Sequence, residues 1–310
     1  MTSWQDKVAN RDILIIDGAM GTELERRGVP MHAETWAGAA LIEHPDKVRQ
    51  AHLDYIVAGA ELIITNTFGA SPHMLNAMGH GADAEKIIRG AVKLAQEARE
   101  ESGKDVAIAG SISTMSAGSD TADPGDRHTT EEIRDSMFRM ADALAAGGCD
   151  MIALEMMQDL TRAPIAMEAA RQTGLPVWLG LTCNWNAGRD TLVAFDFPGT
   201  TFQSILDRLL PMGPDVVSVM HTDVDATTVA LDMVKQGYDG PLGAYPESGY
   251  FQMPHWNFVD VIAPDVLVDR AKGWVGQGVS ILGGCCGLGP EHIVALSAAR
   301  AELQASKATP

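Results

Sequence analysis

A regular alternation of short apolar runs and longer amphipathic stretches constrains the fold of this chain more than any other feature. Eight runs of four to seven residues are rich in Ile, Leu, Val and Ala. Such runs are typical of strands that are buried on both faces of a parallel sheet. The predicted strands are Asp12–Asp17, Glu61–Asn66, Val106–Ser111, Asp150–Glu155, Pro176–Thr182, Asp215–Met220, Pro241–Ala244 and Val279–Gly283.

The stretches between these runs predict helices, because Ala and Leu recur in them every three or four residues. Glycines precede several of the strands, as expected where a helix ends and the chain turns back towards a sheet. Pro290 stands where the first turn of a helix tolerates proline. The predicted helices are Asp46–Ala58, Asp83–Glu101, Thr130–Ala146, Leu160–Gln172, Thr201–Leu210, Asp225–Lys235 and Pro290–Leu303.

Eight strand–helix units in succession predict a closed (β/α)8 TIM barrel of the α/β class. An open doubly wound sheet is the alternative, but the first strand is not followed by the GxGxxG turn of dinucleotide-binding sheets. The 310 residues contain no linker, low-complexity segment or block of like charges. We expect one domain over residues 1–310, with a core from about residue 11 to about residue 304.

The charge balance excludes several classes of partner. Lys and Arg number 23 against 41 Asp and Glu, which gives a formal net charge of −18 at pH 7. Such a field repels phosphate backbones and anionic membrane surfaces, so we expect no nucleic-acid or membrane partner. The first residues lack the apolar run of a signal peptide, and no apolar stretch is long enough to span a bilayer, which predicts a cytoplasmic protein.

The residues that follow the predicted strands are the candidate site residues, because a TIM barrel carries its active site at the carboxyl ends of its strands. They combine carboxylates, thiols, an imidazole and small polar groups, and none is a lysine or an arginine. This composition disfavours a phosphate ligand and suits a positively charged one. The candidates are Asp17, Gly18, Thr67, Phe68, Ser111, Glu155, Cys183, His221, Tyr245, Cys285 and Cys286.

Two adjacent cysteines, Cys285 and Cys286, follow the last predicted strand within the glycine-rich segment ILGGCCGLGPEH (Ile281–His292). Adjacent cysteines are poor disulfide partners, and four cysteines in 310 residues do not form a disulfide framework. Free cysteines can also pack as small apolar residues. A thiol pair at the end of a barrel strand instead favours a soft metal, and a catalytic zinc needs about three protein ligands with one position open.

The segment GGCCGLGPEHI resembles the C-terminal motif of the homocysteine S-methyltransferase family. Other motifs of that family are similar to DGAMGTELERRG (Asp17–Gly28), EHPDKVRQAHLDYIVAGAELIITNTFGAS (Glu43–Ser71) and YPESG (Tyr245–Gly249), in which Glu247 stands where Asn is more usual. The resemblance covers about residues 12–300. It implies a zinc ion held by three thiolates, with the homocysteine sulfur as fourth ligand. It further implies that this sulfur attacks a methyl group carried by a sulfonium, an ammonium or a methylated cofactor.

The third metal ligand departs from the family pattern. The family's third cysteine follows the sixth strand, where this chain has SVMHTD (Ser218–Asp223), with His221 in the place of the cysteine. We predict His221, Cys285 and Cys286 as zinc ligands, since two cysteines and one histidine form an accepted catalytic zinc set. Cys183, in GLTCN after the fifth strand, is the alternative third ligand. Imidazole in place of a thiolate leaves the site less negative, which predicts a weaker sulfur nucleophile.

The same resemblance assigns roles to several strand-end residues. It implies that Glu155 receives the ammonium group of the substrate and that Asp17 and Gly18 contact the substrate, which makes Asp17 and Glu155 the candidate catalytic groups. Trp36 and Tyr245 are candidates for the donor side, because the face of a Trp ring can hold a quaternary ammonium or a sulfonium. The remaining predicted substrate-binding residues are Thr67, Phe68 and Ser111.

These observations predict a zinc-dependent methyltransferase. Its donor would be betaine, a sulfonium compound such as S-methylmethionine, or methylfolate, and its acceptor a zinc-bound thiol, with homocysteine giving methionine. Both substrates are then small molecules, and a separate corrinoid or folate protein is required only if methylfolate is the donor. Two alternatives are a zinc-dependent hydrolase or lyase, in which water takes the open position, and a catalytically silent homologue that binds thiol or metal. The sequence leaves open whether the chain forms a homo-oligomer.

Overall fold

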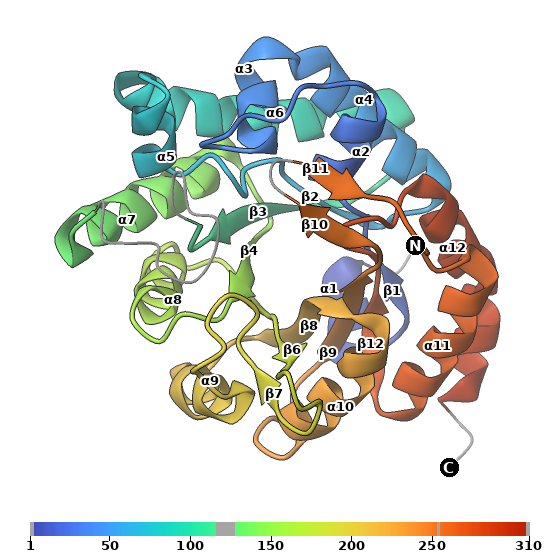
Figure 1. Cartoon of the computed structure of the whole chain (residues 1–310). Coiled ribbons are helices and arrows are strands. Elements are labelled where there is room, and N and C mark those ends of the chain that lie inside the picture. Colours follow the sequence, from blue (N-terminus) through green and yellow to red (C-terminus); the bar gives the residue numbers. More distant parts are fainter. Residues whose placement is uncertain (1–2, 116–127, 253–254, 308–310) are drawn as a thin grey trace.

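The computed structural model describes residues 3–115, 128–252 and 255–307, and it places eight parallel strands in one nearly closed barrel (Figure 1). Neighbouring strands follow the order β1-β12-β9-β8-β5-β4-β3-β2, and a parallel bridge between Ile16 and Leu62 links the two ends of this sheet. The predicted (β/α)8 barrel is therefore confirmed. Its strands are β1 (Leu14–Ile15), β2 (Leu62–Ile64), β3 (Ala107–Ser113), β4 (Met151–Met157), β5 (Val177–Leu181), β8 (Val216–Asp223), β9 (Leu242–Glu247) and β12 (Val279–Leu282).

Helices form an outer ring around the barrel (Figure 1). None of the described helices is both long enough and apolar enough to cross a membrane. Short 3-10 helices cover Ala37–Ala39, Gly81–Asp83 and Leu210–Met212. The α-helices are α1 (Trp4–Asn10), α2 (Met20–Arg26), α3 (Ala40–Glu43), α4 (Pro45–Ala58), α5 (Pro72–Ala77), α6 (Ala84–Ser102), α7 (Thr130–Gly147), α8 (Arg162–Gln172), α9 (Phe202–Leu209), α10 (Val224–Lys235), α11 (Pro264–Gly276) and α12 (Pro290–Ser306).

Local sequence accounts for where several helices begin and end. α7 starts at a capping box, in which the Thr129 hydroxyl accepts from the Glu132 backbone N–H and the Glu132 carboxylate accepts from the Thr129 N–H. Pro290 is the first residue of α12, as predicted. α4 and α7 end at Gly59 and Gly148, whose φ angles of 113° and 91° lie in the left-handed region that glycine adopts most readily.

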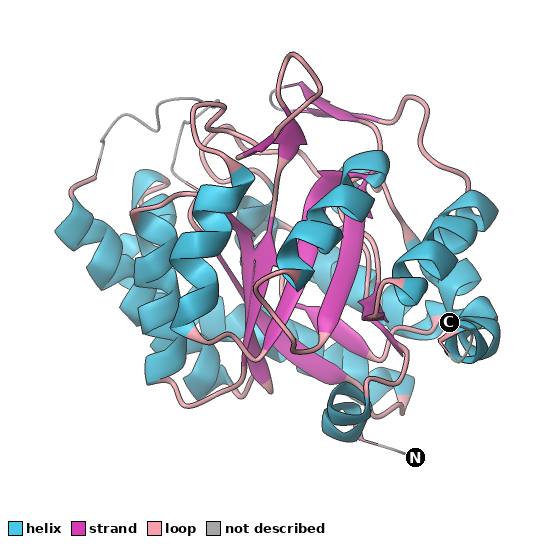
Figure 2. Ribbon diagram, turned by 90° about the horizontal axis from the view of Figure 1, so that it is seen from below, coloured by secondary structure: helices cyan, strands magenta, loops and turns pink. Residues whose placement is uncertain are grey.

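Several elements differ from the prediction. The predicted helices do not include α11, although Leu267, Ala271 and Trp274 are buried on it at helical spacing. Two antiparallel hairpins interrupt the strand–helix alternation: β6 (Asn184–Trp185) with β7 (Leu192–Val193), and β10 (Tyr250–Gln252) with β11 (His255–Asn257). In the side view of Figure 2 these short strands lie at the end of the barrel opposite the N-terminus.

Apolar side chains form one layer inside the barrel and a second, larger layer between the strands and the helices. The inner layer includes Ile16, Met151, Trp178 and Met220, all nearly or fully buried. α1 packs against this layer from the N-terminal end, where the rings of Trp4 and Trp178 meet edge to face with centroids 6.4 Å apart. One end of the barrel is thus closed by side chains, and the carboxyl ends of the strands are left to carry the site.

Tyr55 offers a test of how the first barrel loop is held. Its buried hydroxyl donates to Ala19 O at 2.9 Å and so ties α4 to the loop that follows β1. We expect Tyr55→Phe to lower the free energy of unfolding by about 0.5–1.5 kcal/mol, because the buried Ala19 carbonyl loses its shorter hydrogen bond and keeps only the one from Glu23 N at 3.3 Å. Urea denaturation measures this loss.

Tyr238→Phe is the matched control for this variant. The Tyr238 hydroxyl donates to Asp215 O at the same distance of 2.9 Å, but at an exposed position where water can replace it. We expect this variant to cost less than about 0.5 kcal/mol. Equal losses in the two variants would contradict the assigned role of Tyr55.

Candidate metal centre

Three side chains with metal-binding atoms gather at the carboxyl end of the barrel. His221 belongs to β8, whereas Cys285 and Cys286 follow β12. Their ligand atoms all lie within 4.8 Å of one another, and His221 Nδ1 is 3.5 Å from Cys285 Sγ. His221 and Cys286 are 8 % and 6 % exposed, and Cys285 is partly buried. The structure thus brings together the three residues that the sequence predicts as ligands.

An irregularity at the end of β8 sets the position of His221. The pairing of β8 with β9 shifts register between Met220 and Asp223, and His221 lies in this stretch with a φ angle of 41°. Residues other than glycine rarely adopt such a left-handed conformation, which costs about 1–3 kcal/mol and persists only where the surroundings hold it. The Thr182 hydroxyl of the β5 end donates to His221 O and contributes to that hold.

Backbone hydrogen bonds to the end of β9 hold the loop that carries the cysteines. Cys285 N donates to Pro246 O at 2.8 Å, and Cys286 O accepts from Ser248 N at 2.9 Å. Gly287 has a φ angle of 83°, and a Cβ atom there would lie 1.8 Å from Ser248 O. The approach of the two chain segments therefore requires glycine at this position.

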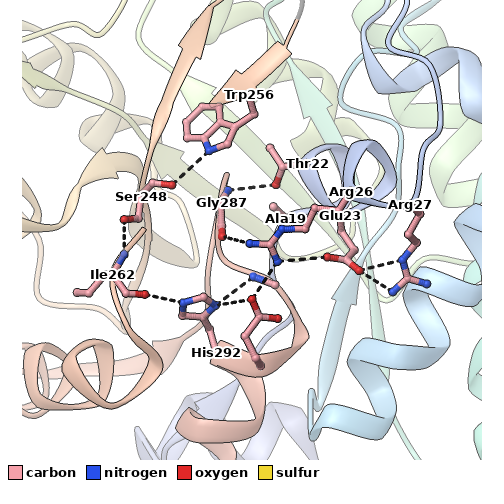
Figure 3. A network of polar contacts seen from close by, with 12 residues as sticks. Ala19, Thr22, Glu23, Arg26, Arg27, Ser248, Trp256, Ile262, Gly287 and His292 are labelled. Atoms are coloured by element: carbon pink, nitrogen blue, oxygen red, sulfur yellow. Dashed lines mark hydrogen bonds and ion pairs between the residues drawn. The ribbon is translucent and has the colours of Figure 1, made fainter. Parts of the chain in front are cut away.

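Side chains from α2 bond to the same loop, and Trp256 of β11 bonds to Ser248 after β9 (Figure 3). Gly287 N donates to Thr22 Oγ1 at 3.1 Å, and Arg26 donates to Gly287 O at 3.1 Å. Trp256 Nε1 donates to Ser248 O at 3.2 Å. The cysteine loop is thus held directly by α2 and by the end of β9, and β11 in turn holds the Ser248 backbone that contacts the loop.

Electrostatic coupling prepares the cluster for a cation. A hydrogen bond from Cys286 and the nearby His221 lower the pKa of Cys285 to about 5, although burial opposes this shift. The same coupling and burial raise the pKa of Cys286 well above its ordinary value. Burial acts to lower the pKa of His221, but the charges of Glu247 and Cys285 outweigh it and raise that pKa. At least one thiol of the pair is therefore a thiolate at neutral pH, the form that binds metals.

Asp17 lies between β1, β2 and the cysteine loop. Its side chain is 1 % exposed, and Oδ2 accepts from Ile64 N at 2.8 Å, while its backbone carbonyl accepts from Gly284 N at 3.1 Å. Burial raises the pKa of Asp17 well above its ordinary value, and the charges of Glu155 and Cys285 add to the shift. A cation bound beside Asp17 would stabilise its ionised form.

Glu155 reaches the same region from β4, in a stretch where the pairing with β5 shifts register. The Ser111 hydroxyl donates to its carboxylate, and burial raises the pKa of Glu155 to about 7. Tyr245 of β9 is 5 % exposed, and burial together with the charges of Glu155 and Cys285 raises its pKa. The predicted residues Asp17, Glu155 and Tyr245 thus act electrostatically on one another and on the cysteines.

Two further carboxylates, which the sequence did not assign to the site, act on His221. Glu247, at the end of β9, has Oε2 3.0 Å from His221 Nδ1. Asp196, in the loop after β7, bonds to Gln158, and burial raises its pKa while the charge of His221 opposes that shift. The rings of Phe195 and Trp256 also lie beside the imidazole, with centroids 4.8 Å and 6.1 Å away.

The structure does not bring Cys183 into the metal-binding cluster. The Cys183 thiol is fully buried and lies 3.9 Å from the Thr222 hydroxyl, which also accepts from the Cys183 N–H. Burial raises the pKa of Cys183 to about 12, so its thiol is protonated at neutral pH. Among the described residues, the only group of three or more side chains suited to a metal consists of His221, Cys285 and Cys286. The alternative third ligand is therefore not supported.

The other predicted substrate residues contact neighbouring rings, hydroxyls or backbone of the protein itself. Trp36 meets Phe68 and Phe251 edge to face, each with ring centroids 6.4 Å apart. Thr67 is fully buried, and its hydroxyl donates to Ser111 O at 2.7 Å, so that its polar group is used within the protein. Gly18 permits a close approach of two loops, since a Cβ there would lie 2.4 Å from the carbonyl oxygen of Leu288.

The three ligand residues fit a zinc ion. Tetrahedral zinc with zinc–sulfur bonds of about 2.3 Å holds its ligand atoms roughly 3–4 Å apart. The distance of 3.5 Å between His221 Nδ1 and Cys285 Sγ lies in this range. Two cysteines and one histidine leave a fourth position for a substrate atom, as catalytic zinc requires.

Comparison with known proteins places this site in a family. The model of the family described as homocysteine S-methyltransferase matches residues 14–300. This chain belongs to the homocysteine S-methyltransferase family. A homocysteine S-methyltransferase from Escherichia coli strain K12 is 31 % identical to it, over 93 % of this chain and 95 % of the relative.

Two further matches agree with this family. A selenocysteine methyltransferase from Astragalus bisulcatus is 26 % identical over 90 % of each protein. The metallated form of the homocysteine methyltransferase MmuM from Escherichia coli has a crystal structure that superposes with a TM-score of 0.72. The sequence identity in that superposition is 26 %, and it covers 93 % of this chain and 96 % of the other. The resemblance inferred from the sequence motifs is therefore confirmed.

Gly287 tests the geometry of the cysteine loop. We expect Gly287→Ala to destabilise the fold by about 1–3 kcal/mol beyond the strain of a left-handed alanine, because the new methyl group collides with Ser248 O. The displaced loop should also make Cys285 and Cys286 react faster with a thiol reagent. Urea denaturation and the rate of thiol modification measure the two effects.

Gly28→Ala is the control, since Gly28 has a similar φ angle of 76° but nothing within 4 Å of the added Cβ. We expect it to cost about 1 kcal/mol from backbone strain alone and to leave thiol reactivity unchanged. Equal effects of the two variants would show that the close approach to Ser248 has no part in holding the cysteines.

Proposed function

We propose that this chain is a zinc-dependent S-methyltransferase that moves a methyl group from a small cationic donor to the sulfur of homocysteine. The observation that carries the proposal is the cluster of His221, Cys285 and Cys286, with ligand atoms within 4.8 Å of one another at the carboxyl end of the barrel. The relatives named for methyl transfer to homocysteine or selenocysteine support the same chemistry. A zinc ion bound there would keep the acceptor sulfur as a thiolate at neutral pH.

The protein's own residues would bind and orient the acceptor. Glu155 would receive the ammonium group of homocysteine. Its pKa of about 7 means that the carboxylate is ionised above neutral pH and can then pair with that group. Ser111, which donates to that carboxylate, would hold it in place. Asp17, at the adjoining strand ends, would add a second negative charge once a bound cation stabilises its ionised form. An amino acid held through its ammonium group presents its thiol in one direction, which favours a single attack geometry.

A cationic donor fits the charge of the site. The principal charges that act on Glu155, Tyr245 and Cys285 come from carboxylates, thiols and His221, and no described lysine or arginine is among them. A sulfonium compound would lose the positive charge of its methylated sulfur on methyl transfer and would then bind less tightly, which would assist product release. The rings of Phe195 and Trp256 beside His221 would exclude water from the reacting atoms.

Cobalt(II) substitution tests the metal site and the acceptor together. We expect the cobalt protein to show the intense thiolate-to-metal absorption of a tetrahedral site, and we expect homocysteine to increase it, because a further thiolate joins the metal. Cys286→Ala should weaken this absorption strongly. Cys149→Ala is the control, since Cys149 is a buried cysteine outside the cluster.

Three outcomes, two spectroscopic and one kinetic, would count against the proposal. A thiolate spectrum that ignores homocysteine would retain the metal site but exclude homocysteine as the acceptor. Absence of any thiolate band would rule out the metal site itself. Turnover of a methylated donor without any thiol would favour a hydrolase.

Glu155→Gln tests the ammonium site. We expect the KM for homocysteine to rise about 10–100-fold with little change in kcat, because the variant loses a charge-assisted contact worth about 1.5–3 kcal/mol. The wild-type KM should also rise as the pH falls below about 7, where Glu155 becomes protonated and neutral. The variant should lack this dependence.

A thiol identical to homocysteine but without the amino group is the matched control for this variant. Its KM should be equal in the wild type and in Glu155→Gln, because it makes no contact through an ammonium group. If the variant raised the KM for both thiols alike, Glu155 would not be the ammonium ligand.

A further inference from the structure

Asp196 is held at the mouth of the barrel by one buried side chain. It lies in the loop after β7, and its partner Gln158 follows β4 and is 4 % exposed. Gln158 Nε2 donates to Asp196 Oδ2, and Gln158 Oε1 accepts from Asp196 N at 2.7 Å. This reciprocal pair of hydrogen bonds fixes both the backbone and the carboxylate of Asp196.

The second carboxylate oxygen of Asp196 is left for a ligand. None of the described residues donates a hydrogen bond to Oδ1. This oxygen is also not one of the fully buried polar atoms of the described residues that lack a partner, so it is accessible. Asp196 therefore presents one bound oxygen to the protein and one unpaired oxygen to the site.

Two aromatic rings lie in the same part of the site. Phe195 directly precedes Asp196, and its ring centroid is 4.8 Å from that of His221. The ring of Trp256 lies 6.1 Å from the same imidazole, and its N–H is already bonded to Ser248 O (Figure 3). Aromatic faces beside a carboxylate attract a weakly hydrated cation.

Asp196 and the proposed acceptor ligand Glu155 lie on different sides of His221. Burial raises the pKa of Glu155 and of Asp196, and the charge of His221 opposes both shifts. Neither carboxylate is among the principal charges that shift the pKa of the other. Both are thus within electrostatic reach of the imidazole but not of each other. If homocysteine is held by Glu155, the side of Asp196 remains for the second substrate.

We propose that Asp196, together with the ring of Phe195, binds the positively charged sulfur of a sulfonium methyl donor and so determines donor specificity. This inference rests on the proposed methyltransferase function. The thiolate sulfur of homocysteine attacks the methyl carbon. The bond from that carbon to the donor sulfur breaks, and its electron pair stays on the donor, which leaves as a neutral thioether.

The geometry of the two cation types favours a sulfonium over a quaternary ammonium. A sulfonium sulfur carries three substituents, so a carboxylate oxygen can approach it directly from the unsubstituted side. A quaternary nitrogen is enclosed by four carbon groups, and proteins usually surround it with several aromatic faces. One accessible carboxylate oxygen beside the Phe195 ring suits the sulfonium.

The change of charge during the reaction predicts which kinetic parameter depends on Asp196. The positive charge of the donor falls as its methyl group leaves, so the carboxylate attracts the bound donor at least as strongly as the transition state. Loss of this carboxylate should therefore raise the KM for the donor and leave kcat unchanged or higher. A merely structural role would instead lower kcat or affect both substrates.

Asp196→Asn tests the proposal in the full chain, with S-methylmethionine as the sulfonium probe. The asparagine oxygen can still accept from Gln158, so the loop stays held while the charge is lost. We expect the KM for S-methylmethionine to rise about 10-fold or more and the KM for homocysteine to stay the same. Calorimetric binding of S-methylmethionine without homocysteine should weaken by a similar factor. Phe195→Leu should raise the donor KM about 2–5-fold.

Two controls separate a local ion pair from other effects of the substitution. Asp190→Asn removes the same charge from the turn between β6 and β7, where Asp190 is exposed and accepts from Asn186. We expect it to change the donor KM less than about 2-fold, because exposed charges are screened. Methyl iodide is a neutral methyl donor, so its rate of reaction with bound homocysteine should be equal in the wild type and in Asp196→Asn.

The outcomes distinguish failure of this inference from failure of the proposed function. A donor KM that Asp196→Asn does not change, or an equal loss of rate with methyl iodide, would overturn only the role of Asp196. A wild type that uses betaine but no sulfonium would do the same. A wild type that methylates homocysteine from neither cation would overturn both proposals. If Asp196→Asn does not fold, an unchanged donor KM in Phe195→Leu would overturn the inference.

Discussion

The close backbone contact between the cysteine loop and the ends of β1 and β9 is the constraint on which the site depends. Asp17 O accepts from Gly284 N, and Pro246 O accepts from Cys285 N. Gly283 permits this approach, because a Cβ there would lie 2.7 Å from Asp17 O. Asp17 and the cysteine loop lie near opposite ends of the chain and meet only when the barrel closes. Assembly of the ligand set is therefore coupled to completion of the fold, as expected where a metal site is absent from the unfolded chain.

Burial of several acids at one end of the barrel has an energetic consequence. Burial raises the pKa values of Asp17, Glu155 and Asp196, so each is harder to ionise than in water. A metal ion and a cationic substrate both relieve this penalty by pairing with the carboxylates. Burial of these acids would thus favour the binding of cations over anions at this end of the barrel.

Sequence periodicity predicted the barrel and the general location of the site, because both follow from the repeated strand–helix unit. It did not predict the hairpin that carries Trp256, since strands of two or three residues leave no periodic signal. It also placed Cys183 among the strand-end candidates, whereas the structure directs that thiol towards Thr222. The left-handed conformation of His221 and its contact with Glu247 depend on a register shift, which residue patterns do not encode.

The pairing of two adjacent strands determines the surroundings of His221. β8 and β9 are adjacent strands, and their pairing joins Met220 to Tyr245 and Asp223 to Glu247 on either side of the irregular stretch. Across this pairing His221 meets Glu247, whose Oε2 lies 3.0 Å from His221 Nδ1. The cysteine loop is held separately, by α2 and by the end of β9. A barrel builds its site from independent strand ends, so the register of one strand pair can set the position of His221 while other contacts hold the cysteines.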